Sequence, residues 1–243
     1  MADHIDSKDL KRIVEDLRRT HGENLASVVL YGSAAAGDFI EQRSDHNLLI
    51  VLAKITLEDL RLSEAPIREW QRLGQAMPVY FTVDELKHAA DVFPIEFLQM
   101  EKARKVLYGS DPLVGMKISK TNLRHQTEYE LRTRLIQLRR LYIAASTSGE
   151  KLSALISDSF ASIAALFRPV LMLLGHEPPI TKEESMRAIV RLVGMDRSLF
   201  ERILEQRAKK ELSLSEAEAN ELFAAYLVQI EQLIKAVNGI ECR

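Results

Sequence analysis

The sequence lacks the features that define several specialised classes of protein. Its 243 residues include one cysteine, Cys242, so no disulfide can form within the chain and no cysteine-rich zinc site can be assembled. We therefore expect a reducing, cytoplasmic location. The 33 Lys and Arg residues are balanced by 35 Asp and Glu residues, for a net charge of −2. Because nucleic-acid binding relies on many positive contacts to phosphates, nucleic acid is not an expected partner.

Long uninterrupted apolar runs are also missing. Residues 1–24 are polar and charged, where a secretory signal needs an apolar stretch. The most apolar later stretch, residues 152–175, carries Asp158 and Arg168 and contains Pro169, which is unlike a membrane span. We expect no membrane partner and interpret this stretch as a buried helix of a bundle. With 47% hydrophobic residues, the chain is long enough to bury a sizeable core, which excludes disorder.

The periodicity of apolar residues changes along the chain. The predicted strands lie at 26–31, 48–53, 78–83 and 106–109, and the first two are apolar enough to be buried on both faces. Helices are predicted over 6–21, over 57–73 with an interruption at Pro66, and almost continuously after residue 122. The sequence therefore predicts an α/β domain over residues 1–112, followed by an all-helical bundle domain over residues 113–243.

Charge divides along the same boundary. Residues 1–112 carry 14 basic and 19 acidic side chains, a balance of −5, which leaves +3 for the rest of the chain. The basic cluster of the helical half has two interpretations. Arg132, Arg134, Arg139 and Arg140 lie at helical spacing, which favours ordinary solvated helix faces with local ion pairs. The alternative is a surface, including Lys151, that faces an anionic ligand.

The stretch that carries chemistry is residues 28–52, VVLYGSAAAGDFIEQRSDHNLLIVL. A strand ends at Gly32-Ser33, and Ser44-Asp45-His46-Asn47 opens the next strand. Gly32 lets the backbone approach a phosphate, and Ser33 at a helix N-terminus offers donors to an anion. Strand alternation places Asp45 and Asn47 on one face, whereas His46 points away and is expected to be packed in the interior.

This arrangement resembles the nucleotidyltransferase superfamily related to DNA polymerase β, and in particular its small-molecule branch, which includes the aminoglycoside nucleotidyltransferases. The resemblance implies an α/β (α+β) domain with a small mixed sheet before a helical domain. It also implies transfer of a nucleoside monophosphate from a nucleoside triphosphate to a hydroxyl of a small molecule or a protein, with Mg²⁺ as cofactor. The residues that match the signature are Gly32, Ser33 and Ser44 for the nucleotide, and Asp45 and Asn47 for metal binding and catalysis.

The sequence departs from that signature at two carboxylates. Asn47 stands where the family has aspartate, and an amide oxygen can coordinate Mg²⁺ but carries no charge and cannot act as a base. Tyr80 stands at the place of the third carboxylate in the run Pro-x-Glu-x-Thr. Glu85 and Glu96 are the nearest substitutes in sequence, although Glu85 is expected to cap a helix or face solvent.

Two functional hypotheses follow from these departures. The first is a nucleotidyltransferase with weak activity, in which metal binding depends largely on the phosphates of the nucleotide. The second is a pseudoenzyme that retains the fold as a nucleotide-binding, small-molecule-binding or protein-interaction module. The expected partners are a nucleotide and an unidentified small molecule, with a homodimer as a further possibility.

Overall fold

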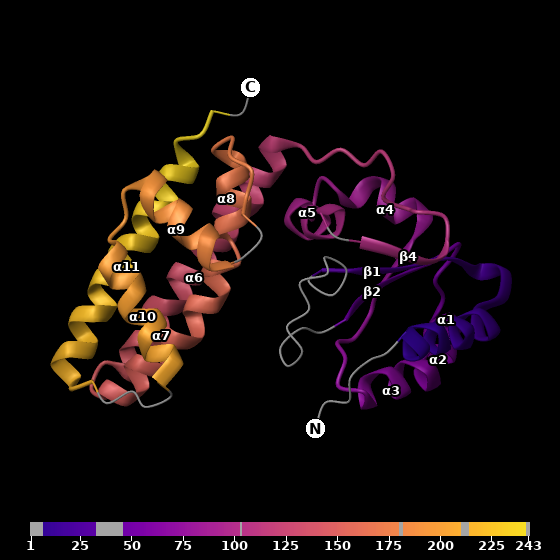
Figure 1. Cartoon of the computed structure of the whole chain (residues 1–243), viewed down its shortest axis with the longest axis horizontal. Coiled ribbons are helices and arrows are strands. Elements are labelled where there is room, and N and C mark those ends of the chain that lie inside the picture. The colour runs from indigo at the N-terminus through magenta and orange to yellow at the C-terminus, as the bar shows by residue number, and fades with distance from the viewer. Residues whose placement is uncertain (1–6, 33–45, 103, 180–181, 210–213, 242–243) are drawn as a thin grey trace. The chain divides into compact units, whose positions relative to one another are not determined.

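The chain folds into two compact units in a computed structural model, which describes residues 7–32, 46–102, 104–179, 182–209 and 214–241 (Figure 1). The units are Met1–Ser119 and Lys120–Arg243. The observed division lies further along the chain than residue 112. Leu113 is buried in the core of the first unit, and Met116 and Ile118 pack against the same core, so this connecting stretch belongs to the first unit.

The first unit is a small sheet with helices on both sides. Its elements are α1 (Ser7–His21), the 3₁₀ helix η1 (Gly22–Asn24), β1 (Leu25–Tyr31), β2 (Asn47–Leu52), α2 (Leu57–Leu62), α3 (Glu64–Arg72), β3 (Val79–Thr82), α4 (Val83–Ala89), α5 (Pro94–Lys102) and β4 (Arg104–Gly109). All four strands predicted from the sequence are present with small differences at their ends. The predicted helix over 57–73 is two helices that meet at Ser63, and Pro66 lies in the first turn of α3, where its missing N–H costs no helical hydrogen bond.

The four strands form a mixed sheet in the order β3-β2-β1-β4. β1 is antiparallel to both of its neighbours, and β2 is parallel to β3. Tyr31, the last residue of β1, lies opposite Asn47 of β2 and Arg104 of β4. The end of β1 and the starts of β2 and β4 therefore meet at one edge, which we call the Gly32 edge.

Both faces of this sheet are buried, as the apolar runs predict. On one face, Val28, Leu30 and Ile50 pack with residues of α1 and α3, including Trp70; we call this cluster the α1–α3 core. On the other face, Val29, Leu49 and Val51 pack with residues of α4 and α5; we call this cluster the α4–α5 core. Figure 1 shows α1, α2 and α3 on one side of the strands and α4 and α5 on the other. Because side chains alternate along a strand, neighbouring residues contribute to different cores.

In its described residues the second unit consists of helices and the segments that join them. Its helices are α6 (Lys120–Ala145), α7 (Gly149–Ala164), α8 (Phe167–Leu173), α9 (Lys182–Val193), α10 (Arg197–Lys209) and α11 (Glu216–Asn238). Leu131, Leu135 and Leu138 form the buried face of α6, as the spacing predicts. The rings of Tyr142 on α6 and Phe223 on α11 stack with centroids 4.8 Å apart, which joins the two longest helices.

One described segment of this unit, Gly149–Leu173, is long and apolar enough by length and composition to cross a membrane. Half of its most apolar window is buried inside the fold, and core helices of soluble proteins pass the same test. The segment is divided between α7 and α8, because the first helix ends at Ala164 and the second begins at Phe167.

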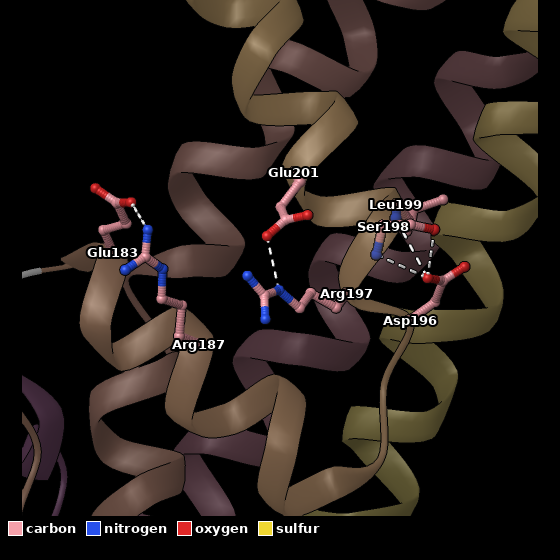
Figure 2. Close-up of polar contacts among 7 residues, drawn as sticks. All are labelled: Glu183, Arg187, Asp196, Arg197, Ser198, Leu199 and Glu201. Atoms are coloured by element: carbon pink, nitrogen blue, oxygen red, sulfur yellow. Dashed lines mark hydrogen bonds and ion pairs between the residues drawn. The ribbon is translucent and has the colours of Figure 1, made fainter.

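Local polar contacts fix where the helices of the second unit begin. Asp196 precedes α10, and its Oδ1 accepts hydrogen bonds from the backbone N–H of Ser198 at 2.9 Å and of Leu199 at 3.4 Å (Figure 2). The Ser198 hydroxyl donates to the same oxygen at 2.7 Å, and these bonds lower the pKa of Asp196. Figure 2 also shows the exposed ion pairs Glu183–Arg187 and Arg197–Glu201, each four residues apart on one helix.

Candidate functional site

The Gly32 edge carries Gly32 and Asn47, the two described residues of the predicted signature, and Gly32 has a backbone conformation that suits glycine. Its φ is +85°, in the left-handed region that other residues rarely adopt. A Cβ at this position would lie 3.1 Å from Nδ2 of Asn47. The absence of a side chain therefore lets the first residue of β2 lie close against the backbone that ends β1.

Asn47 lies on the face of the sheet that carries the α4–α5 core. It is in register with Tyr31, and it alternates with Leu49 and Val51, which belong to that core. Its side chain is partly buried. Of the other predicted site residues, Ser33, Ser44 and Asp45 lie outside the described part of the chain.

Tyr80 does not lie near Asn47. It is in register with Ile50 and packs against the α1–α3 core, on the opposite face of the sheet. Its hydroxyl is buried without a hydrogen bond of ordinary geometry among the described residues. Burial raises the pKa of Tyr80, with a smaller opposing effect from the nearby Ser63 hydroxyl. The residue at the place of the third carboxylate is thus a packing residue on the far face.

The two alternative carboxylates are in different situations. Glu85 belongs to the capping box of α4: its backbone N–H donates to the Thr82 hydroxyl at 3.1 Å, and its carboxylate accepts from the Thr82 N–H at 2.7 Å. This confirms the expected capping role. Glu96 lies in the first turn of α5, and its charge acts on Tyr31 at the Gly32 edge. Burial is the larger cause that raises the pKa of Tyr31, and the negative charge of Glu96 adds to it.

His46 is packed in the interior, as expected from its place between Asp45 and Asn47. It is buried, and its ring meets that of Trp70 edge-on with centroids 6.4 Å apart. The Oε1 atom of Gln75 accepts a hydrogen bond from the His46 backbone N–H at 2.7 Å and lies 3.2 Å from its Nδ1. No sequence pattern singles out Gln75, because this contact depends on how the loop before β3 returns to the sheet.

Three arginines of the predicted basic cluster on α6 take part in ion pairs. Arg132 contacts Glu128 at 2.8 Å, and Arg139 contacts Glu231 on α11 at 2.6 Å. Arg134 pairs with Glu130. These contacts agree with the interpretation of this cluster as a solvated helix face.

The described residues offer few donors for a metal. No group of three or more His, Cys, Asp or Glu side chains among them is placed to hold a metal ion. At the Gly32 edge the described residue of the predicted metal-binding pair is Asn47, whose amide is neutral. This donor fits a Mg²⁺ ion that takes most of its oxygen ligands from phosphates or water.

A comparison with solved structures finds the same architecture. The crystal structure of spectinomycin adenyltransferase AAD(9) from Enterococcus faecialis, with ATP and spectinomycin, matches with a TM-score of 0.59 and 14% sequence identity. The match covers 96% of this chain and 100% of that chain. No protein-family model and no curated protein matches the sequence. At this identity the likeness concerns the fold, so the chain has the fold of a nucleotidyltransferase with a helical C-terminal part.

Proposed function

We propose that this protein is a nucleotidyltransferase that moves a nucleoside monophosphate from a nucleoside triphosphate to a hydroxyl of a small molecule. The observation that carries the proposal is the Gly32 edge. The left-handed glycine of the family signature lies there, pressed against Asn47 at the start of the adjoining strand, in a chain with the adenyltransferase fold. The proposed location is the cytoplasm.

The proposed reaction is an in-line displacement at the α-phosphorus. The acceptor oxygen forms a bond to that phosphorus, the bond to the bridging oxygen breaks, and pyrophosphate leaves while the hydroxyl proton passes to a base or to water. Gly32 lets Asn47 lie against the backbone at this edge, and Asn47 supplies a neutral oxygen or N–H group to a phosphate. Mg²⁺ bound to the triphosphate neutralises phosphate charge. From the sequence, Ser33 and Ser44 bind phosphate and Asp45 is the one remaining signature carboxylate.

A second candidate is a binding module that holds a nucleotide or small molecule and does not catalyse transfer. This module could also assemble as a homodimer. The observation that favours it is Asn47, because a neutral amide stands where the family has an aspartate. Tyr80 faces the α1–α3 core, on the side of the sheet opposite Asn47, so position 80 offers no group to the Gly32 edge. Transfer would then be slow or lost while the nucleotide still binds.

Calorimetric titration with α,β-methylene-ATP, which cannot transfer its α-phosphorus, tests binding. We expect binding that strengthens in Mg²⁺ and is lost in Asp45→Ala. Asp91→Ala is the matched control, because Asp91 is an exposed acidic residue between α4 and α5. The control should bind like the unmodified protein. Absence of binding at any Mg²⁺ concentration contradicts the enzyme and the nucleotide-binding form of the module.

Incubation with ATP labelled at the α-phosphate separates the two candidates. Spectinomycin and other aminocyclitols are the first acceptors to test, because the solved adenyltransferase was crystallised with spectinomycin. Label that appears in the acceptor, and not in the Asp45→Ala reaction, supports the enzyme. Tight nucleotide binding with no labelled product across the acceptor panel supports the binding module.

A further inference from the structure

A cavity of the first unit lies away from the Gly32 edge. It has a volume of about 450 Å³ and is bounded by α4, by residues 110–117 and by the start of β1 at Ala26 and Ser27. Gly32 follows Ala26 by six strand positions, which separates the two places by roughly 20 Å at 3.3 Å per residue. The cavity is therefore distinct from the proposed nucleotide site.

Part of the wall of this cavity is apolar. Val51, Leu86, Ala90 and Met116 line it, and the first three are buried parts of the α4–α5 core. Two further lining residues, Val83 and Val114, are 42% and 74% exposed. Exposed apolar side chains beside a cavity of this size are typical of a small-molecule site, whose volume usually falls between about 300 and 1,000 Å³.

Positive charge lies at the rim of the cavity. Lys87 and Lys117 both line it, and both are exposed. Nζ of Lys87 lies 3.6 Å from Asp84, a pair open to water that leaves the ammonium able to bind other groups. Lys117 makes no ion pair with any other described residue. The rim therefore carries a net positive charge.

Residues 110–117 form one wall of the cavity, and polar contacts with neighbouring residues of the first unit hold this wall in place. Asp111 accepts a hydrogen bond from the backbone N–H of Leu113 at 3.0 Å and forms a half-buried ion pair with Arg104 at 2.9 Å. The Ser27 hydroxyl donates to the carbonyl of Tyr108 at 3.0 Å. These contacts lie within the first unit, and a wall held by them costs less ordering when a ligand binds.

We propose that this cavity binds a small amphipathic monoanion, with its apolar part against Val51, Leu86 and Ala90 and its anionic group beside Lys87 and Lys117. The proposal is independent of the nucleotidyltransferase activity. It assigns a second ligand class, an alkyl or aryl carboxylate, to the opposite end of the sheet.

Calorimetric titration of the full chain with sodium octanoate tests the proposal, with 1-octanol as the uncharged probe. We expect one saturable octanoate site per chain and weaker binding of octanol. Lys117→Glu should weaken octanoate by about tenfold, because it replaces attraction at the rim with repulsion. Lys105→Glu is the matched control: Lys105 is an exposed lysine of β4 that does not line the cavity. It should change the affinity less than twofold, an effect of net charge alone.

Ala90→Trp is the second variant, because its indole fills the cavity and should abolish octanoate binding. The circular dichroism melting curve of Ala90→Trp shows whether this variant folds. If it does not fold, Lys117→Glu still tests the proposal, because Lys117 is exposed. Absence of a saturable site, or equal affinity in the unmodified protein and Lys117→Glu, overturns the proposal.

A nucleotide titration at saturating octanoate checks the placement of the cavity site. Unchanged nucleotide affinity is expected from two separate sites, and mutual exclusion overturns the placement. A chain that binds octanoate but no nucleotide contradicts the proposed function and leaves this site standing.

Discussion

The two units of the chain are held together in different ways. In the first unit, strands far apart in the sequence are hydrogen-bonded, as at Ser27 and Gly109, and both faces of the sheet are buried. In the second unit, long helices pack on their neighbours, and their starts are fixed by local caps such as that of Asp196. We infer that the first unit depends on a few positions where backbones come close, whereas the second spreads its stability over many smaller contacts.

The strongest test of this difference is Gly109→Ala. Gly109 has a φ of +75°, and a Cβ there would lie 2.0 Å from the carbonyl oxygen of Ala26. We expect the free energy of unfolding of the first unit to fall by at least about 3 kcal/mol, or the sheet not to form, because neither backbone can move without breaking the strand pairing. Fluorescence of Trp70, the one tryptophan, measures this in urea, since Trp70 is buried in the α1–α3 core.

Gly115→Ala is the matched control for that variant. Gly115 has nearly the same φ, +76°, but nothing lies within 4 Å of the added Cβ. Its cost should be about 1 kcal/mol, from backbone conformation alone. Equal losses at the two glycines would show that the close approach of Gly109 to Ala26 does not matter.

Gly149→Ala asks whether the second unit has a similar weak point. Gly149 is the first residue of α7, and a Cβ there would lie 2.2 Å from the carbonyl oxygen of Leu214, just before α11. We expect a loss of about 1–3 kcal/mol, less than at Gly109, because a short segment before a helix can shift. Far-UV circular dichroism should show it while Trp70 fluorescence stays unchanged. If Gly149→Ala lowers the free energy of unfolding as much as Gly109→Ala does, the two units do not differ in the way inferred above.

Asp196→Ala removes a local cap and should cost about 1 kcal/mol at neutral pH. The folded pKa of Asp196 is lowered, so its contribution is present above the ordinary value of 3.8 and is lost as the pH falls through the lowered folded pKa. The difference in melting temperature from the unmodified protein should therefore shrink in acid. Asp196→Asn keeps an oxygen acceptor at the cap, so it should retain more stability than alanine and show no such pH dependence.

The smallest expected effect is that of Glu96→Gln at the Gly32 edge. Removing the negative charge should lower the pKa of Tyr31, which stays above 10 because burial is the larger cause of its elevation. Tyrosinate absorbance during alkaline titration measures the change, and Tyr31→Phe identifies which transition belongs to Tyr31. An identical Tyr31 transition in both proteins would show that Glu96 does not act on this edge.

The sequence predicted the parts of the fold that depend on local pattern. Residues 28–30 and 48–52 are apolar without alternation, and this pattern requires a sheet covered on both faces. The order of the strands could not be predicted in the same way, because pairing of residues 27–31 with 104–109 is decided by contacts distant in sequence. The sequence pattern does not predict the helix α5, because the apolar residues of α5 show little helical periodicity.

The positions of Gly32 and Asn47 at the ends of adjacent strands, and the packing of His46, agree with the motif and with strand alternation. The roles of Gly32 and Asn47 in binding and catalysis stay predictions. The face taken by Tyr80 depends on the register of β3 against β2, which only the paired strands define. The link between Glu96 and Tyr31 depends in turn on how α5 crosses the sheet.

The position of β1 inside the sheet has a consequence during synthesis on the ribosome. Its partner β4 ends at Gly109, more than 70 residues after the end of β1. The backbone N–H and C=O groups along one side of β1 therefore have no partner strand until those residues have been synthesised. Until then the nascent chain exposes an apolar strand with an open edge, which invites pairing with other chains. A chaperone that binds short apolar segments would meet this protein at residues 25–31, before its helical unit has emerged.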